Sequence, residues 1–139
     1  MKEKVENIVV KFAKKQYNFC FDIVFYDVTT LYFETFEEDE LRKNGFSKDN
    51  KSQQPQILMG LIVSKEGFPV AYDIFAGNTF EGHTILPLIT DFIQKHSVNS
   101  FTVVADAAMI SQTNIEALKK SDLNYIVGAR LGNLSDKMI

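Results

Sequence analysis

The chain has 139 residues, a length that fits one domain with a sizeable core. Its net charge of −3 gives no overall attraction to nucleic acid, so any such contact needs a local basic patch. The single cysteine, Cys20, excludes an intrachain disulfide and favours a reducing compartment. Because the N-terminus lacks a secretory signal and no apolar run reaches about 18 residues, we expect a cytoplasmic protein without a membrane association.

The N-terminal segment has the pattern of a helix over residues 3–17. Apolar residues recur at helical spacing between lysines and glutamates: Val5, Ile8, Val9 and Phe12. We expect this stripe to pack the helix against the rest of the chain. The predicted organisation is an N-terminal helix over residues 1–18, followed by a larger domain over residues 19–139.

The next segment predicts a buried strand over residues 19–28 that contains one carboxylate, Asp27. The run FDIVFY before it is apolar and rich in β-branched and aromatic residues, as a buried strand requires. Burying a carboxylate in such surroundings without a partner is costly. Two explanations of Asp27 remain open, a structural hydrogen bond and the binding of a cation.

Residues 34–56 interrupt the apolar pattern with a polar stretch that is first acidic and then basic. Its apolar content is too low for a core element, which predicts a long exposed loop, and loops of this length are usually functional or mobile. A solvated connection is one interpretation. The other is contact with phosphate groups through four basic side chains: Arg42, Lys43, Lys48 and Lys51.

A β-hairpin is predicted from two apolar strands, residues 57–63 and 69–75, joined by a short turn. Gly67 lies in the turn and is available for a positive φ. Gly60 within the first strand indicates either a bulge or a close approach of another group to the backbone. Asp73 in the second strand is interpreted as an outward-facing residue of an alternating strand rather than as a ligand.

The second half alternates helices and strands. The pattern predicts a helix over residues 84–96, a strand over 101–105, a helix through Lys120 opened by a capping box of Thr113 and Glu116, and a strand over 123–127. Such alternation implies parallel pairing, whereas the hairpin is antiparallel. An α/β fold with a mixed sheet flanked by helices follows. The ribonuclease-H-like arrangement, an antiparallel meander extended by two parallel strands, fits this order, and other α/β layouts remain open.

Two aspartates follow apolar strands in a similar way, Asp27 after FDIVFY and Asp106 after FTVVA. Ligands gather at the carboxyl ends of strands in open α/β sheets, and two carboxylates on neighbouring strands can share a hard cation such as Mg²⁺. Such a site suits phosphodiester chemistry. The alternative is that each aspartate caps a turn or a helix. His83 and His96 do not have the spacing of a metal site, and the helix dipole accounts for His96 near a helix C-terminus.

Three long segments carry a resemblance to a known family: YDVTTLYFET, LRKNGFSKDNKSQQPQILMGLIVSKEGFPVAYDIFAGNTFEGHT, and VVADAAMIS followed by NYIVGAR. They resemble the catalytic core of bacterial insertion-sequence transposases of the DDE type, in the family with a later Tyr-Arg-Glu-Lys signature. The resemblance covers about residues 20–132. It implies a ribonuclease-H-like fold, Mg²⁺ or Mn²⁺ as cofactor, and DNA strand cleavage and transfer at transposon ends. Asp27 and Asp106 match the first and second catalytic, metal-binding aspartates.

The resemblance also implies a third acid, a glutamate in the Tyr-Arg-Glu-Lys segment, which does not occur up to Ile139. We therefore expect a fragment, truncated before the last catalytic helix and inactive alone, that carries two of three acids and associates with DNA and with other copies of itself. Two alternatives remain: an inactive transposase remnant that only folds, self-associates or binds DNA, and a different metal-dependent nuclease on the same fold.

Overall fold

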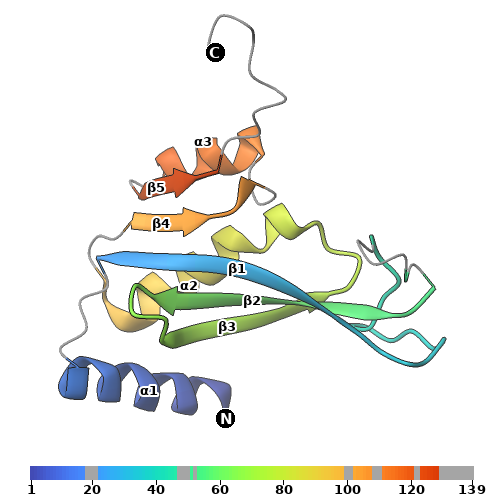
Figure 1. The fold of residues 1–139 in the computed structure, drawn as a ribbon, viewed down its shortest axis with the longest axis horizontal. Coiled ribbons are helices and arrows are strands. Elements are labelled where there is room, and N and C mark those ends of the chain that lie inside the picture. The colour runs from blue at the N-terminus through green and yellow to red at the C-terminus, as the bar shows by residue number, and fades with distance from the viewer. Residues whose placement is uncertain are drawn as a thin grey trace, which may run out of the picture.

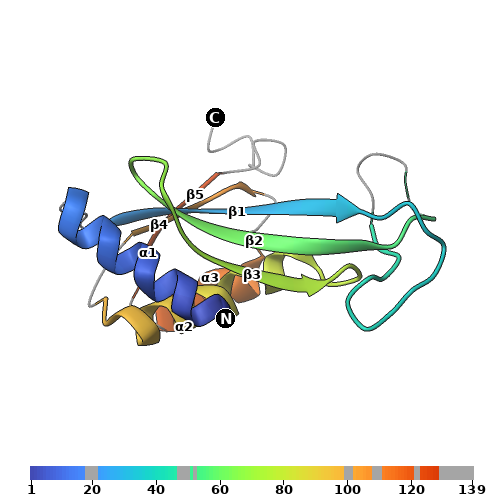
Figure 2. The same cartoon turned by 90° about the horizontal axis from the view of Figure 1, so that it is seen from below.

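The computed structural model describes residues 1–17, 22–46, 51, 53–98, 102–107, 111–120 and 123–128. These residues form one mixed β-sheet with helices against one of its faces (Figures 1 and 2). In chain order the elements are α1 (Lys2–Tyr17), β1 (Ile23–Tyr32), β2 (Gln56–Ser64), β3 (Pro69–Ala76), the 3-10 helix η1 (Glu81–His83), α2 (Ile85–His96), β4 (Thr102–Ala105), α3 (Gln112–Lys120) and β5 (Asn124–Val127).

The sheet has five strands in the order β3-β2-β1-β4-β5. The three strands β1, β2 and β3 form an antiparallel meander, and β4 and β5 extend it in parallel to β1. The predicted mixed sheet is therefore confirmed. The hairpin turn is confirmed as well, with Gly67 at a φ of +84° that side-chain-bearing residues rarely adopt.

Strand β1 differs from the prediction at its end. It continues to Tyr32, so Asp27 is the fifth of ten strand residues and the prediction that it nearly ends the strand is wrong. The continuation is rich in residues that favour strands, and it pairs with the first half of β2, from Thr29 opposite Met59 to Tyr32 opposite Gln56. Residues 19–21 of the predicted strand lie outside the described residues.

The core lies between the sheet and α2. The sheet contributes Val24, Tyr26 and Ile62, and the helix contributes the predicted apolar stripe: Ile85, Leu88, Ile89 and Phe92 are buried, and Ile93 packs against them. Because side chains alternate along a strand, Phe25, Asp27 and Leu31 point to the opposite face. No helix in the described part of the chain covers that face (Figure 2), and it is called the open face below.

Helix α1 is present as predicted, but the side that it buries is a different one. Glu6, Val10 and Ala13 are buried, whereas Val5, Ile8 and Phe12 are 51%, 67% and 51% exposed. The predicted apolar stripe therefore largely faces solvent.

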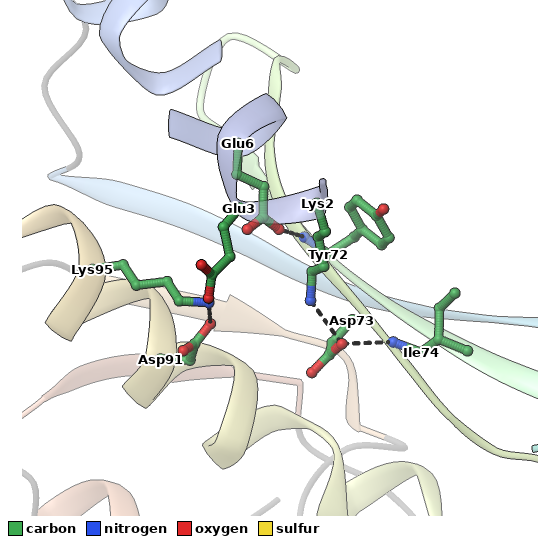
Figure 3. A network of polar contacts seen from close by, with 8 residues as sticks. All are labelled: Lys2, Glu3, Glu6, Tyr72, Asp73, Ile74, Asp91 and Lys95. Carbon is green, nitrogen blue, oxygen red and sulfur yellow. Dashed lines mark hydrogen bonds and ion pairs between the residues drawn. The ribbon is translucent and has the colours of Figure 1, made fainter. Parts of the chain in front are cut away.

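Polar contacts along the edge strand β3 explain this orientation (Figure 3). The Glu6 carboxylate accepts a hydrogen bond from the backbone N–H of Tyr72 at 3.3 Å, and Lys2 pairs with Asp73 at 2.7 Å. Lys95 of α2 lies 3.4 Å from Glu3. An edge strand has backbone groups without a neighbouring strand, and Glu6 of α1 accepts the hydrogen bond of one of them, the N–H of Tyr72. Asp73 is thus half exposed in an ion pair at the margin of the helix-covered side.

Helix α3 begins two residues earlier than the predicted capping box implies, and its cap is a different residue. The hydroxyl of Ser111 accepts the backbone N–H of Asn114 at 3.1 Å, the geometry of an N-cap, whereas Thr113 lies within the helix. The predicted capping box is therefore wrong. The buried side chain of Asn114 donates to the carbonyl of Gly82 and so joins α3 to η1.

The loop after β1 has no helix and no strand among residues 34–46, as predicted. Its base is fixed to β2. The backbones of Lys43 and Gln56 exchange hydrogen bonds of 3.1 and 2.9 Å, and the side chain of Gln56 donates to the carbonyls of Gly77 at 2.8 Å and Phe46 at 3.2 Å. The loop therefore projects from a fixed base at one end of the sheet (Figure 1).

Candidate functional site

The two candidate aspartates lie at the same height on neighbouring parallel strands. Tyr26 of β1 and Ala105 of β4 are paired in the parallel ladder. Asp27 and Asp106 each follow directly after one member of this pair, and both are exposed. Neighbouring strands are about 4.8 Å apart, so the two residues are close in space. The prediction that Asp106 comes directly after its strand is correct, since β4 ends at Ala105.

A buried hydrogen-bond chain holds β1 in place next to Asp27. The hydroxyl of Tyr26 donates to Thr84 Oγ1 at 2.6 Å, and the Thr84 hydroxyl donates to the carbonyl of Glu81 at 2.6 Å. Burial raises the pKa of Tyr26 to about 12, so this hydroxyl remains a donor at physiological pH. These two hydrogen bonds connect the middle of the sheet to the start of α2, and therefore fix the backbone from which Asp27 projects.

Two glycines allow the close packing that this site requires. A Cβ at Gly60 would lie 2.7 Å from the hydroxyl oxygen of Tyr26, so only glycine leaves room for the tyrosine ring. Of the two explanations for Gly60, the close approach is correct; the irregularity between β2 and β3 lies at Ile62 and Val63. Gly128, after β5, lies against the backbone of Ala107 and donates to the carbonyl of Ala105 at 3.3 Å.

The oxygen chemistry of this pair fits a hard divalent cation. Mg²⁺ is usually bound through one or two carboxylates while water or substrate phosphate completes its shell. Asp27 and Asp106 offer two exposed carboxylates at one height and neither forms an ion pair with another described residue. Among the described residues, no group of three or more His, Cys, Asp or Glu side chains is close enough to hold a metal ion. The two aspartates alone thus provide an incomplete but accessible coordination shell for a metal ion.

Three of the four basic side chains that were predicted to contact phosphate lie against groups of the chain itself. Arg42 donates to Asp39 at 2.6 Å and lies over the ring of Phe33, and Lys43 lies 3.9 Å from Glu38. Hydrogen bonds from the backbone and side chain of Arg42 lower the pKa of Asp39 to about 2. Lys51 lies 5.1 Å from the centre of the Tyr32 ring. Lys48 lies outside the described residues.

His96 has a different environment from the one that the sequence indicated. It is buried against Phe92 with ring centres 4.9 Å apart, and its Nε2 has no hydrogen-bond partner among the described residues. Burial lowers the pKa of His96, which favours the neutral imidazole. His96 is a packing residue of the helical side.

Sequence reasoning named both aspartates, whose role stays a prediction, but did not indicate the hydrogen bond beside Asp27. Tyr26 and Thr84 are 58 positions apart, and nothing in either segment indicates that they form a hydrogen bond. The one available signal was Gly60, which indicated a close approach without naming the approaching group.

The described helices are all too short or too polar to cross a lipid bilayer.

Comparison with solved structures assigns the fold. The chain resembles a Mos1 transposase paired-end complex with left transposon end (TM-score 0.50, 12% identity) and a pre-cleavage Mos1 transpososome (0.50, 9%). It also resembles a piggyBac transposase synaptic complex with hairpin DNA (0.53, 10%). The matches cover 89%, 92% and 92% of this chain but only 40%, 43% and 29% of those chains. The fold is therefore the ribonuclease-H-like transposase core, as predicted.

The family follows from the sequence itself. Residues 18–137 match the family model described as "Transposase DDE domain", so the chain belongs to that family. A comparison with curated proteins gives no match. The family is thus confirmed at the level of the DDE transposase domain, while the narrower group with the Tyr-Arg-Glu-Lys signature stays a prediction.

Proposed function

We propose that this domain contributes to metal-dependent DNA strand cleavage and transfer at transposon ends, with Asp27 and Asp106 as two of the metal-binding carboxylates. One observation carries the proposal. The pairing of Tyr26 with Ala105 gives the two aspartates the same height on adjacent strands, next to the hydrogen-bond chain from Tyr26 to Glu81. DDE transposases use divalent metal ions, which supports Mg²⁺ or Mn²⁺ as the cofactor.

The role of this chain's own residues follows from their chemistry. Asp27 and Asp106 would hold the cation through oxygen atoms, and Tyr26, anchored on Thr84, keeps the first of them at a fixed height. When bound, the metal neutralises charge on a phosphodiester and favours displacement at phosphorus. Without a metal, two carboxylates this close repel each other, and this repulsion favours cation binding.

The proposed substrate is duplex DNA, specifically transposon ends, because two of the similar Mos1 and piggyBac structures are named as end or synaptic complexes with DNA. The net charge of −3 gives no general attraction to DNA, so contacts must be local. Contact through Arg42, Lys43, Lys48 and Lys51 stays a prediction, and the ion pairs of Arg42 and Lys43 weaken it.

Titration with Mn²⁺, followed by paramagnetic broadening of backbone amide signals, tests the site. We expect broadening centred on Tyr26–Val28 and Ala105–Ala107, with weak affinity because the pair supplies few protein ligands. Asp27→Asn and Asp106→Asn should each remove it. Asp91→Asn is the matched control, since Asp91 lies on α2 in an ion pair with Lys95. Broadening that persists in Asp27→Asn would refute the assignment.

A cleavage assay with end-labelled duplex DNA tests the activity separately. We expect no strand transfer by this chain alone, because two acids provide too few ligands for a firm two-metal site. Metal-dependent cleavage by the purified chain that survives Asp27→Ala would contradict both the expected inactivity and the assigned role of Asp27.

A further inference from the structure

The outward side of α1 combines aliphatic and positively charged side chains. Val5 and Ile8 are mostly exposed. Lys4, Lys11 and Lys15 lie on the same side of the helix as Ile8, since positions three, four and seven apart face one direction. In the described part of the chain these three lysines form no ion pair, unlike Lys2, which pairs with Asp73. With five lysines and two glutamates, α1 has a net charge of +3.

Residues 34–46, called the acidic loop here, offer the complementary chemistry. The acidic loop contains five acidic and two basic residues, a net charge of −3. Phe36 and Phe46 are each 83% exposed. Glu38 and Asp39 are ion-paired within the loop, whereas Glu34, Glu37 and Glu40 are exposed and form no ion pair with other described residues.

These two surfaces suit each other better than either suits DNA. The acidic loop would repel phosphate, and phosphate contacts give no reason for Val5 and Ile8 to lie between the lysines. Burying exposed aromatic residues against aliphatic side chains is energetically favourable. Opposite charges at the rim of the contact orient the two surfaces. Within one molecule the acidic loop projects from the end of the sheet remote from α1 (Figures 1 and 2).

We propose that the acidic loop of one copy docks on the outward side of α1 of a second copy of this chain. Phe36 and Phe46 pack against the aliphatic side chains of the helix, and Glu34, Glu37 and Glu40 of the loop face Lys4, Lys11 and Lys15. The contact uses neither Asp27 nor Asp106. It therefore goes beyond the proposed function, and its test does not depend on metal or DNA.

Sedimentation velocity of the purified chain over a range of concentrations tests the proposal, at salt concentrations of about 50 and 500 mM. We expect reversible self-association that weakens at high salt. Phe36→Ser/Phe46→Ser and Lys4→Glu/Lys11→Glu should each raise the dissociation constant about tenfold or more. Lys119→Glu/Lys120→Glu, with the same charge change at exposed positions of α3, is the matched control and should associate like the unmodified chain.

A charge exchange identifies the partner surfaces. Glu37→Lys/Glu40→Lys alone should weaken association, and an equimolar mixture with Lys4→Glu/Lys11→Glu should restore a mixed complex. Circular dichroism verifies the fold, and Ile8→Ser is a milder helix variant in case a double variant does not fold. The proposal is overturned by a chain that stays monomeric at every concentration, or by variants that all associate normally. It is also overturned if Lys4→Glu/Lys11→Glu weakens binding to a generic DNA duplex while self-association is unchanged.

Discussion

The two faces of the sheet carry similar apolar residues but have different surroundings. On the helix-covered face, Val24, Tyr26 and Ile62 are fully buried under α2. On the open face, Phe25 and Leu31, on the same strand, are each 43% exposed, and Asp27 lies between them in the alternation. The covered face thus supplies most of the stability. On the open face, Asp27 and its apolar neighbours are accessible to water or to a partner.

A matched pair of phenylalanine truncations gives the largest test of this contrast. Phe92→Ala on α2 should cost about 3–5 kcal/mol of unfolding free energy, because it removes a buried ring and leaves a cavity. Phe25→Ala on the open face should cost less than about 1.5 kcal/mol, because much of its ring is already in water. Urea unfolding with an unchanged m-value measures both.

Equal losses for the two variants would break the contrast. They would mean that the open face is buried in solution, through contacts with another copy or with another part of the chain. Repeating the unfolding at several protein concentrations separates these cases, since only association makes the midpoint depend on concentration.

A second test concerns the contact between Gly60 and Tyr26 beneath the candidate site. Gly60→Ala should cost about 1–3 kcal/mol, because the new Cβ would lie 2.7 Å from the tyrosine hydroxyl. Tyr26→Phe should cost about 1 kcal/mol through loss of the hydrogen bond to Thr84. The double variant should be less destabilised than the sum of the two, because removing the hydroxyl also removes the clash.

Additive effects in this double-mutant cycle would contradict the close approach as the reason for glycine at position 60. The Mn²⁺ titration on the same variants extends the test to the site. If the hydrogen bond from Tyr26 to Thr84 positions Asp27, Mn²⁺ at a given concentration should broaden fewer amide signals around Asp27 in Tyr26→Phe than in the unmodified protein. The fold of this variant should remain intact.

The sequence was sufficient where a pattern repeats along one element. The hairpin, the apolar stripe of α2 and the parallel strands beside β1 each have their own local period, and all were predicted correctly. The equal height of Asp27 and Asp106 on neighbouring strands was reachable because each comes directly after an apolar run, although the true end of β1 at Tyr32 was not.

The failures share a physical cause, which is that a distant group decides the local outcome. α1 buries Glu6 rather than its apolar stripe because the edge strand β3 offers a backbone N–H at Tyr72. Ser111 rather than Thr113 caps α3, and a displacement of two residues is enough to change the capping partner. Tyr26 and Thr84 meet only because the fold brings β1 onto α2.

The smallest expected effect is a pH dependence that arises on the helix-covered side. His96, the last residue of α2, is buried. Its burial lowers its pKa, and the charges of Lys14, Glu6, Lys95 and Asp91 also act on it. Because the folded state binds this proton less readily than the unfolded state, the stabilising contribution is complete above the ordinary histidine pKa of about 6.5 and is lost as the pH falls below it. One such group changes the unfolding free energy by at most about 1.4 kcal/mol per pH unit.

His96→Gln should therefore flatten the dependence of stability on pH between about 5 and 7, whatever its effect on absolute stability. His83→Gln is the matched control, since His83 is the other histidine of the chain and is exposed against Phe80. Urea midpoints at each pH measure the slope. A slope that is unchanged in His96→Gln, or that disappears equally in His83→Gln, would show that the titrating group lies elsewhere and that α1 and α2 do not keep His96 from water.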